Sequence, residues 1–331
     1  MKILVLGGAG YIGSHTVYRL IEQGNEVVIF DNLETGYIEA VHPKAKFYKG
    51  DLRNRVEIDA VLDKEGGIDA VIHFAANSLV GESMINPLKY YDNNLCGTKV
   101  LLESLVAHNI KNIVFSSTAA TYGEPKHTPI LEDDPTNPTN CYGETKKAME
   151  RMFYWTQQAH GLKYVSLRYF NACGAHISGK IGEAHNPETH LIPIILQAAN
   201  GTRDHISIFG TDYNTPDGTC IRDYIHVTDL AQAHILAVKY LLNGGESNIF
   251  NLGNGVGFSV REVIETAKKV TGKEIKVIEE ERRAGDPAIL IASSDKAKNI
   301  LGWKPEYDDL STIIETAWKW HSTHLNGYLS D

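Results

Sequence analysis

Cysteine is scarce in this chain, and no two cysteines lie close together in the sequence. Four residues in 331, Cys96, Cys141, Cys173 and Cys220, stand far apart and form no C-x-x-C motif. This spacing favours reduced thiols in a cytoplasmic protein over a disulfide framework or a cysteine zinc site. The sequence therefore predicts a cytoplasmic location and no metal site.

Positive charge is also in deficit. Lysine and arginine number 32 against 41 acidic residues, which gives a formal net charge of −9. Such a balance argues against general affinity for nucleic acid or for an anionic membrane. A phosphate-bearing ligand must instead be bound by a local site.

Long hydrophobic runs are missing as well. The apolar N-terminal stretch is interrupted by Gly7, Gly8 and Gly10, and no small-residue cleavage site follows it. No run approaches the roughly 20 apolar residues that a membrane-spanning helix needs. We expect a soluble protein without a membrane anchor.

A glycine-rich turn dominates what is present. Apolar residues 2–6 predict a buried strand, and Gly7, Gly10 and Gly13 follow it at the start of a helix expected over 11–23. A second apolar stretch, 26–30, ends at Asp31. This order of strand, glycine turn, helix, strand and acid is typical of a dinucleotide site. No basic residue follows Asp31 before Lys44, which favours NAD over NADP.

The alternation of strands and helices then continues. Further strands are predicted over 46–49, 70–73, 112–116 and 163–168, with helices over 54–64, 87–109 and 140–160. This pattern predicts an α/β fold, a Rossmann-type doubly wound parallel sheet, over 1–171. After residue 171 the rhythm changes, and residues 172–331 are expected to form a smaller mixed α/β substrate lobe. Parts of 221–253 are expected to rejoin the first domain.

A candidate catalytic group lies at the ligand-binding edge of this sheet. Tyr142 and Lys146 are four residues apart, and so fall on one face of a helix that Asn140 can cap. The lysine charge, together with a bound cationic nicotinamide, would lower the tyrosine pKa and suit it as a base. Thr118, at the end of a predicted strand, can relay the proton. The three residues predict oxidation of a secondary alcohol by hydride transfer.

The second lobe indicates the kind of substrate. Arg222 and Arg283 lie in segments that also carry aspartate, and suit the two phosphates of a sugar nucleotide. Phe209 is a candidate for stacking on a base, and Asn171 for donating to a phosphate. For each residue alone, a surface salt bridge or a core role is the more common interpretation.

These motifs resemble the UDP-glucose 4-epimerase family of extended short-chain dehydrogenases/reductases, essentially end to end. The matching segments are 6–15, 31–33, 73–76, 90–94, 141–143, 168–171, 222–226 and 283–286. The resemblance implies tightly held NAD, oxidation at the sugar C4, rotation of a 4-keto intermediate and return of the hydride. It also implies interconversion of UDP-glucose and UDP-galactose in galactose metabolism, with Tyr142 as base. A homodimer through helices 87–109 and 140–160 is expected.

The expected site residues fall into three groups. The catalytic residues are Tyr142, Lys146 and Thr118. The cofactor residues are Gly7, Gly10, Tyr11, Ile12, Gly13, Asp31, Asn32, Leu33, Glu34, Thr35, Gly36, Asp51, Leu52, Phe74, Ala75, Ala76, Asn77, Ser78, Asn93, Ser116, Tyr142, Lys146 and Phe170. The substrate residues are Thr118, Tyr142, Asn171, His190, Leu191, Phe209, Arg222, Arg283, Asp286 and Leu290.

Three positions depart from the family pattern. Ser78 stands where some members have a lysine, and His190 where others have asparagine. Leu290 aligns with a residue that controls access of N-acetylated UDP-sugars in the family. The alternative of a UDP-N-acetylglucosamine 4-epimerase or a dual-substrate epimerase therefore stays open.

More distant alternatives are a sugar-nucleotide 4,6-dehydratase, a dehydrogenase that releases NADH and an NAD-binding regulatory module. A dehydratase needs a further acid/base pair after Thr118, where this chain has Ala119 and Ala120.

Overall fold

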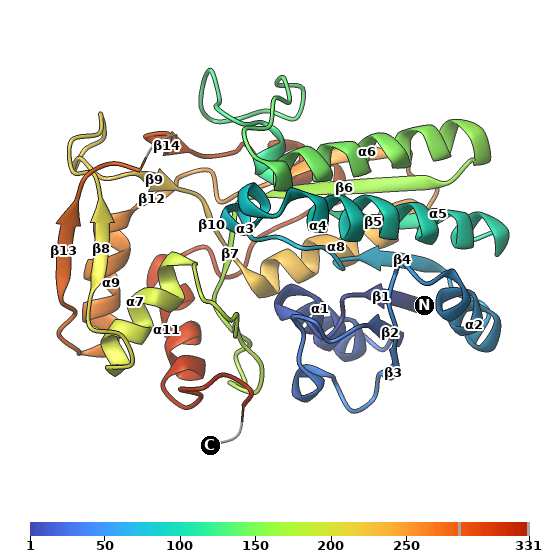
Figure 1. The fold of residues 1–331 in the computed structure, drawn as a ribbon, viewed down its shortest axis with the longest axis horizontal. Helices are drawn as coiled ribbons and strands as arrows, with labels where there is room; N and C mark the ends of the chain where they lie inside the picture. The colour runs from blue at the N-terminus through green and yellow to red at the C-terminus, as the bar shows by residue number, and fades with distance from the viewer. Residues whose placement is uncertain (284–285, 330–331) are drawn as a thin grey trace.

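A seven-stranded parallel sheet forms the centre of the molecule (Figure 1). The computed structural model describes residues 1–283 and 286–329. The strands run in the spatial order β11-β6-β5-β4-β1-β2-β3. They are β1 (Lys2–Leu6), β2 (Glu26–Asp31), β3 (Lys46–Lys49), β4 (Ala70–His73), β5 (Asn112–Ser116), β6 (Lys163–Tyr169) and β11 (Asn248–Leu252). The expected doubly wound α/β fold is confirmed.

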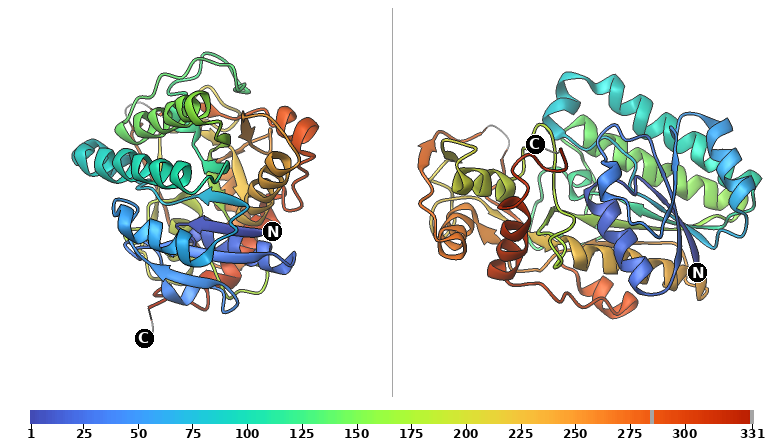
Figure 2. Two further views of the ribbon diagram at one scale, coloured as in Figure 1. Left: turned by 90° about the vertical axis from the view of Figure 1, so that its right-hand side faces the viewer. Right: turned by 90° about the horizontal axis from the view of Figure 1, so that it is seen from below.

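Helices cover both faces of this sheet (Figure 2). The helices α1 (Tyr11–Glu22), α8 (Val227–Leu242) and α10 (Asp295–Leu301) pack on one face, and α2 (Arg55–Glu65), α5 (Gly97–Ala107) and α6 (Cys141–His160) on the other. Successive strand residues point to opposite faces. In β1, Ile3 and Val5 therefore join the first core, and Leu4 and Leu6 the second. Burial on both faces explains why the strands read as continuous apolar runs.

The strand order reverses beside β1, which has β2 on one side and β4 on the other. At such a reversal the connections leave the sheet toward opposite faces, and a crevice opens at the carboxyl ends of the strands. The glycine turn after β1 and the segment after β4 both lie at this point. The fold thus places the predicted dinucleotide site where a doubly wound sheet binds ligands.

The remaining elements form a second, smaller group, at the left of Figure 1. Helices α7 (Leu191–Asn200), α9 (Val260–Thr271) and α11 (Leu310–His321) share a separate hydrophobic core. Short strands pair there: β7 (Asn171–Cys173) with β10 (Tyr224–His226), β8 (Ile206–Phe209) with β13 (Val277–Glu280), and β9 (Ile221–Arg222) with β12 (Phe258–Ser259) and β14 (Ile289–Leu290). The β9–β12 pair is antiparallel and the others are parallel, so this lobe is mixed α/β as expected.

The helix expected over 87–109 is interrupted. It begins as α4 (Pro87–Tyr90), widens into the π-helical segment η2 (Tyr91–Cys96) and continues as α5, after the separate helix α3 (Val80–Ile85). In the wide turn the buried Asn94 amide bonds the backbone of Asn77 and the hydroxyl of Thr145. Because these contacts join three distant segments, they give a physical reason for the π turn, which is common at functional sites.

Helix α6, with 20 residues, carries several charged side chains along its length. Neither α6 nor any other helix among residues 1–283 and 286–329 is long and apolar enough to cross a membrane.

Candidate active site

The turn after β1 packs so tightly that glycine is required at two positions. Gly7 has a φ of +77°, and a Cβ there would lie 2.7 Å from the backbone nitrogen of Ala75. A Cβ on Gly13 would lie 2.1 Å from the carbonyl oxygen of Gly7. The backbone at the N-terminus of α1 therefore lines the crevice directly, where free N–H groups favour a phosphate. These residues fit the pyrophosphate of a dinucleotide.

Asp31, at the end of β2, organises the adjoining loop. Its Oδ2 accepts a hydrogen bond of 2.9 Å from the Ala9 backbone, and its Oδ1 accepts one of 2.8 Å from the Leu33 backbone. Burial raises the pKa of Asp31, and these two bonds oppose that rise. Leu33 has a φ of 61°, a region that a branched side chain rarely adopts. Asp31 thus fixes the loop and lines the crevice, and its role toward a ribose hydroxyl stays a prediction.

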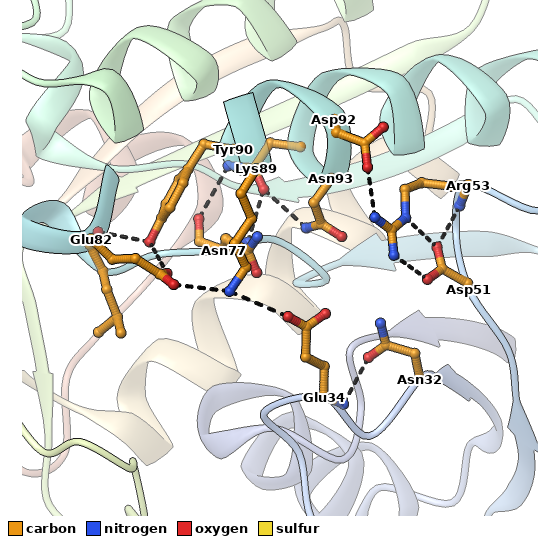
Figure 3. Close-up of polar contacts among 12 residues, drawn as sticks. Asn32, Glu34, Asp51, Arg53, Asn77, Glu82, Lys89, Tyr90, Asp92 and Asn93 are labelled. Atoms are coloured by element: carbon orange, nitrogen blue, oxygen red, sulfur yellow. Dashed lines mark hydrogen bonds and ion pairs between the residues drawn. The ribbon is translucent and has the colours of Figure 1, made fainter. Parts of the chain in front are cut away.

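Lys89 bridges two walls of the cofactor crevice (Figure 3). Its Nζ lies 3.0 Å from Glu82 on α3 and 3.4 Å from Glu34 in the loop after β2. Glu82 and Glu34 both line the crevice. Sequence patterns gave no reason to single out Lys89, because its two partners are far from each other in the chain.

A second bridge lies beside it and involves the predicted adenine contact (Figure 3). The Arg53 guanidinium bonds both carboxylate oxygens of Asp51 and also Asp92 of η2. Arg53 lowers the pKa of Asp51 to about 2. The Asp51 carboxylate is therefore engaged with Arg53 and does not line the crevice, so its contact with adenine stays a prediction.

The three predicted catalytic residues come from two neighbouring elements. Tyr142 and Lys146 lie one turn apart on α6, whose cap Asn140 accepts a 2.8 Å bond from the Gly143 backbone. Thr118 follows β5. The Lys146 Nζ donates to the Ser116 carbonyl at 2.8 Å and lies 5.8 Å from the centre of the Tyr142 ring. The structure therefore brings the three side chains together on one wall of the crevice.

Burial dominates the electrostatics of this group. It raises the pKa of Tyr142 to about 12, although a hydrogen bond with Thr118 opposes the rise. Burial also lowers the pKa of Lys146 to about 7. The expected fall in the tyrosine pKa is not found in the ligand-free chain, because desolvation outweighs it and the lysine is itself driven toward its neutral form.

The crevice continues from the glycine turn past Tyr142 into the second lobe. Its volume is about 1320 Å³, larger than the ~300–1,000 Å³ typical of a pocket for one small ligand. The predicted residues that line it are Gly7, Gly10, Tyr11, Ile12, Gly13, Asp31, Asn32, Glu34, Thr35, Leu52, Phe74, Ala75, Ala76, Asn77, Ser78, Asn93, Ser116, Thr118, Tyr142, Lys146, Phe170, Asn171, His190, Arg222, Arg283, Asp286 and Leu290. Those that do not line it are Leu33, Gly36, Asp51, Leu191 and Phe209.

The two predicted phosphate-binding arginines are held differently. Arg222 donates to the carbonyls of Ile221 and Pro287, at 2.9 and 2.8 Å. Arg283 lies with its guanidinium carbon 3.8 Å from the centre of the Phe209 ring. Arg283 thus covers one face of the Phe209 ring, and the stacking of Phe209 on a base stays a prediction. Ala284 and Gly285 of the same motif lie outside the described residues.

This geometry can be compared with known proteins. Residues 3–253 match the model of the NAD dependent epimerase/dehydratase family. The chain belongs to this family. It is 58% identical over 331 residues to a UDP-glucose 4-epimerase of Halalkalibacterium halodurans, covering 100% of this chain and 98% of the relative.

Solved structures agree with this family assignment. One titled UDP-glucose 4-epimerase has a TM-score of 0.98 at 55% identity, over 100% of both chains. Another, from Bifidobacterium longum in complex with NAD⁺ and UDP, has a TM-score of 0.92 at 39% identity, over 99% of this chain and 100% of that one.

The two positions after Thr118, where a dehydratase is expected to carry a further acid/base pair, can now be placed in the structure. Ala119 and Ala120 line the crevice there and begin a short 3₁₀ turn. Methyl groups cannot transfer a proton, so Ala119 and Ala120 cannot supply the additional acid/base pair that elimination of water requires. The wall therefore favours the epimerase side of the family.

A second polar group in the crevice wall was not predicted from the sequence. Glu183, His185 and Glu188 lie beside the predicted His190 and line the crevice with it. Burial opposes a charge on the histidines, yet the two carboxylates raise the pKa of His185 to about 9 and that of His190 to about 10. The stretch reads as a polar loop, and only the spacing E-x-H-x-x-E-x-H could have pointed to a cluster.

Proposed function

We propose that this chain interconverts UDP-glucose and UDP-galactose by reversible oxidation at the sugar C4, with a tightly bound NAD. One observation carries the proposal: Thr118, Tyr142 and Lys146 share a crevice that runs from the glycine turn to Arg222 and Arg283. The relatives named UDP-glucose 4-epimerase support it, as does the NAD⁺ and UDP complex of the Bifidobacterium longum protein.

Each residue has a defined part in the proposed mechanism. NAD⁺ supplies a hydride acceptor and a cationic ring when bound. The Tyr142 phenolate takes the proton from the sugar 4-hydroxyl, and the Tyr142 hydroxyl so formed returns it in the second half of the reaction. Thr118 orients the sugar 4-hydroxyl. Lys146, which donates a hydrogen bond to the Ser116 carbonyl, positions the nicotinamide ribose. Its positive charge favours the phenolate form of Tyr142.

The proposal also assigns a task to each part of the chain. Residues 1–171, with parts of 221–253, bind the cofactor, and residues 172–331 bind the UDP-sugar. We place the protein in the cytoplasm, since its four cysteines are all free and suit a reducing compartment.

The direct test is an activity assay without added cofactor. We expect purified protein to convert UDP-galactose into UDP-glucose at neutral pH, because the cofactor returns to its starting state in each cycle. Separation of the two sugars by chromatography, with released NAD measured after denaturation, checks this. Folded, NAD-loaded protein that forms no product would contradict the proposed function.

The same assay decides a second candidate substrate. Leu290 lines the crevice and packs, as Phe170 does, against the small buried cluster of Ala119, Tyr122 and Ile130. Leucine is smaller than the tyrosine of restrictive family members, which favours turnover of UDP-N-acetylglucosamine as well. Conversion of UDP-glucose alone would exclude the dual-substrate alternative.

We also propose a homodimer formed through α5 and α6. An apolar groove of about 570 Å³ lies on these helices, with Leu102, Val106, Met152 and Trp155 in its lining. The Trp155 side chain is 60% exposed in the single chain. A large aromatic residue beside an apolar groove is typical of an interface centre.

The replacement Trp155→Glu tests this surface. We expect the wild-type protein to be a dimer and this variant to be a monomer at micromolar concentration, because a buried unpaired carboxylate opposes association. Sedimentation or light scattering gives the mass. Val256→Glu, at a position 72% exposed and outside the groove, is the control and should remain dimeric. A dimeric Trp155→Glu variant would remove the groove from the interface.

A further inference from the structure

Two buried carboxylates and two imidazoles face one point in the crevice wall. The ligand atoms of Glu183, His185, Glu188 and His190 all lie within 4.8 Å of one another. The side chains of Glu183 and Glu188 are only 3% and 4% exposed. Burying two carboxylates this deeply requires compensation by positive charge. Among the described residues, the ion pairs to both come from histidine alone.

The four carboxylate–imidazole distances in the cluster are close to those between the ligands of a tetrahedral metal ion. The Glu183 Oε1 lies 3.1 Å from the His185 Nδ1 and 2.9 Å from the His190 Nδ1. Glu188 lies 2.9 Å from the His190 Nδ1 and 3.6 Å from the His185 Nδ1. Ligands at ~2.0–2.1 Å from a tetrahedral zinc ion are about 3.3 Å apart. The observed distances bracket that value.

Backbone hydrogen bonds hold one carboxylate of the cluster in place. The Glu188 Oε1 accepts bonds of 2.7 and 2.8 Å from the backbone N–H groups of Thr189 and His190, at the start of α7. This carboxylate offsets the positive end of that helix. Its Oε1 also lies 2.9 Å from the His190 Nδ1, and its Oε2 lies 3.6 Å from the His185 Nδ1. Such supporting bonds are typical of the groups around metal ligands.

The alternative to a metal ion is a pair of protonated histidines. The rings of His185 and His190 have their centres 5.1 Å apart, so two imidazolium cations would repel each other. One divalent ion provides the same two positive charges at the centre of the cluster and leaves both rings neutral. The neutral ring is also the form that binds a metal.

We propose that Glu183, His185, Glu188 and His190 form a closed, structural site for a divalent transition-metal ion of the zinc type. Four protein ligands leave no open position, which is typical of a structural rather than a catalytic zinc site. The ion holds segment 183–190 in one conformation, and the His185 ring of that segment meets Tyr11 edge to face, with centres 6.1 Å apart. This site was not expected from the sequence.

Metal binding is tested on untagged, NAD-loaded protein stripped of metal with a chelator. We expect one Zn²⁺ per chain, bound without added nucleotide, and a higher midpoint of thermal unfolding once it is bound. Co²⁺ should give the visible bands of a tetrahedral site without the near-ultraviolet charge-transfer band of a thiolate ligand. That spectrum separates this cluster from Cys96, which is exposed.

Two variants, His185→Gln and His190→Gln, should each weaken Zn²⁺ binding by ~100-fold or more, because each loses one of four ligands. Both keep a hydrogen-bonding side chain, and circular dichroism together with bound NAD confirms that they fold. His205→Gln, an exposed histidine paired with Asp204, is the control and should bind normally.

Three results would overturn the site. They are the lack of stoichiometric binding in folded wild-type protein, binding that the two histidine variants leave unchanged, and binding that needs UDP. The first would mean that the cluster is an ion-pair network of two glutamates and two protonated histidines.

Discussion

The replacement Tyr142→Phe should lower kcat by ~10²–10⁴-fold, the usual contribution of a general base. The change removes one hydroxyl and keeps the ring, so the buried packing on α6 is preserved. Bound NAD and the circular dichroism spectrum should therefore match those of the wild type. Rates measured for UDP-glucose and UDP-galactose in both directions give the size of the loss.

A matched control comes from the opposite end of the strands, away from the crevice. Tyr164 is a buried tyrosine near the start of β6, whereas the crevice lies at the carboxyl ends of the strands. Tyr164→Phe should keep the wild-type rate within about twofold, since it touches no part of the crevice. A Tyr142→Phe variant with a rate within tenfold of the wild type would remove Tyr142 from the role of base.

The replacement Lys146→Met should lower activity and raise stability at the same time. Burial lowers the pKa of Lys146 to about 7, whereas an unfolded lysine titrates near 10.4. At pH 7 the unfolded chain therefore binds a proton more readily, which costs the folded protein ~4 kcal/mol. Replacing the lysine removes this cost. It also removes the hydrogen bond to the Ser116 carbonyl, and this loss destabilises the folded protein by roughly 1–3 kcal/mol. We therefore expect a net stabilisation of about 2 kcal/mol.

The pH dependence of that gain identifies its source. Below pH 7 both states hold the proton and the cost is complete; above the unfolded pKa neither state holds it and the cost vanishes. The stability advantage of Lys146→Met should thus be largest below pH 7 and fade as the pH rises toward 10.4. Urea unfolding of cofactor-free protein at several pH values measures it.

Lys147→Met is the control for this experiment. Its Nζ donates to the Thr136 carbonyl at 2.8 Å, so it loses a comparable hydrogen bond one residue along α6. It should keep activity and gain no stability. If Lys146→Met were less stable than the wild type at pH 7, the buried lysine would not carry the predicted cost.

The elements that were predictable from the sequence are those with local causes. Residues close together in the chain determine strand β1, the turn that contains Gly7 and Gly13, and the capped helix that carries Tyr142. The ends of the helices expected over 11–23, 54–64 and 140–160 agree within a residue or two. Helices α3 and α10 were not predicted, and the helix expected over 87–109 is interrupted at η2. There the geometry depends on Asn94 contacting Asn77 and Thr145, a contact between segments that no local pattern contains.

Other features depended on contacts across the fold. The position of Arg283 on the Phe209 ring joins residues far apart in the chain. The tyrosine pKa depends on how completely the folded chain buries Tyr142, and a helical spacing of four cannot show that. The Glu183–His190 cluster is local in sequence, but its meaning comes from the burial of both carboxylates.

The seventh strand of the sheet has a consequence for how the protein is made. β11 (Asn248–Leu252) pairs with β6, and α8 covers the sheet beside it. As the chain leaves the ribosome, the outer edge of β6 stays unpaired until residues up to 252 have emerged. An open apolar strand edge invites pairing with other chains. The nascent first half therefore depends on its own second half for protection, and a fragment ending at residue 171 should aggregate rather than fold.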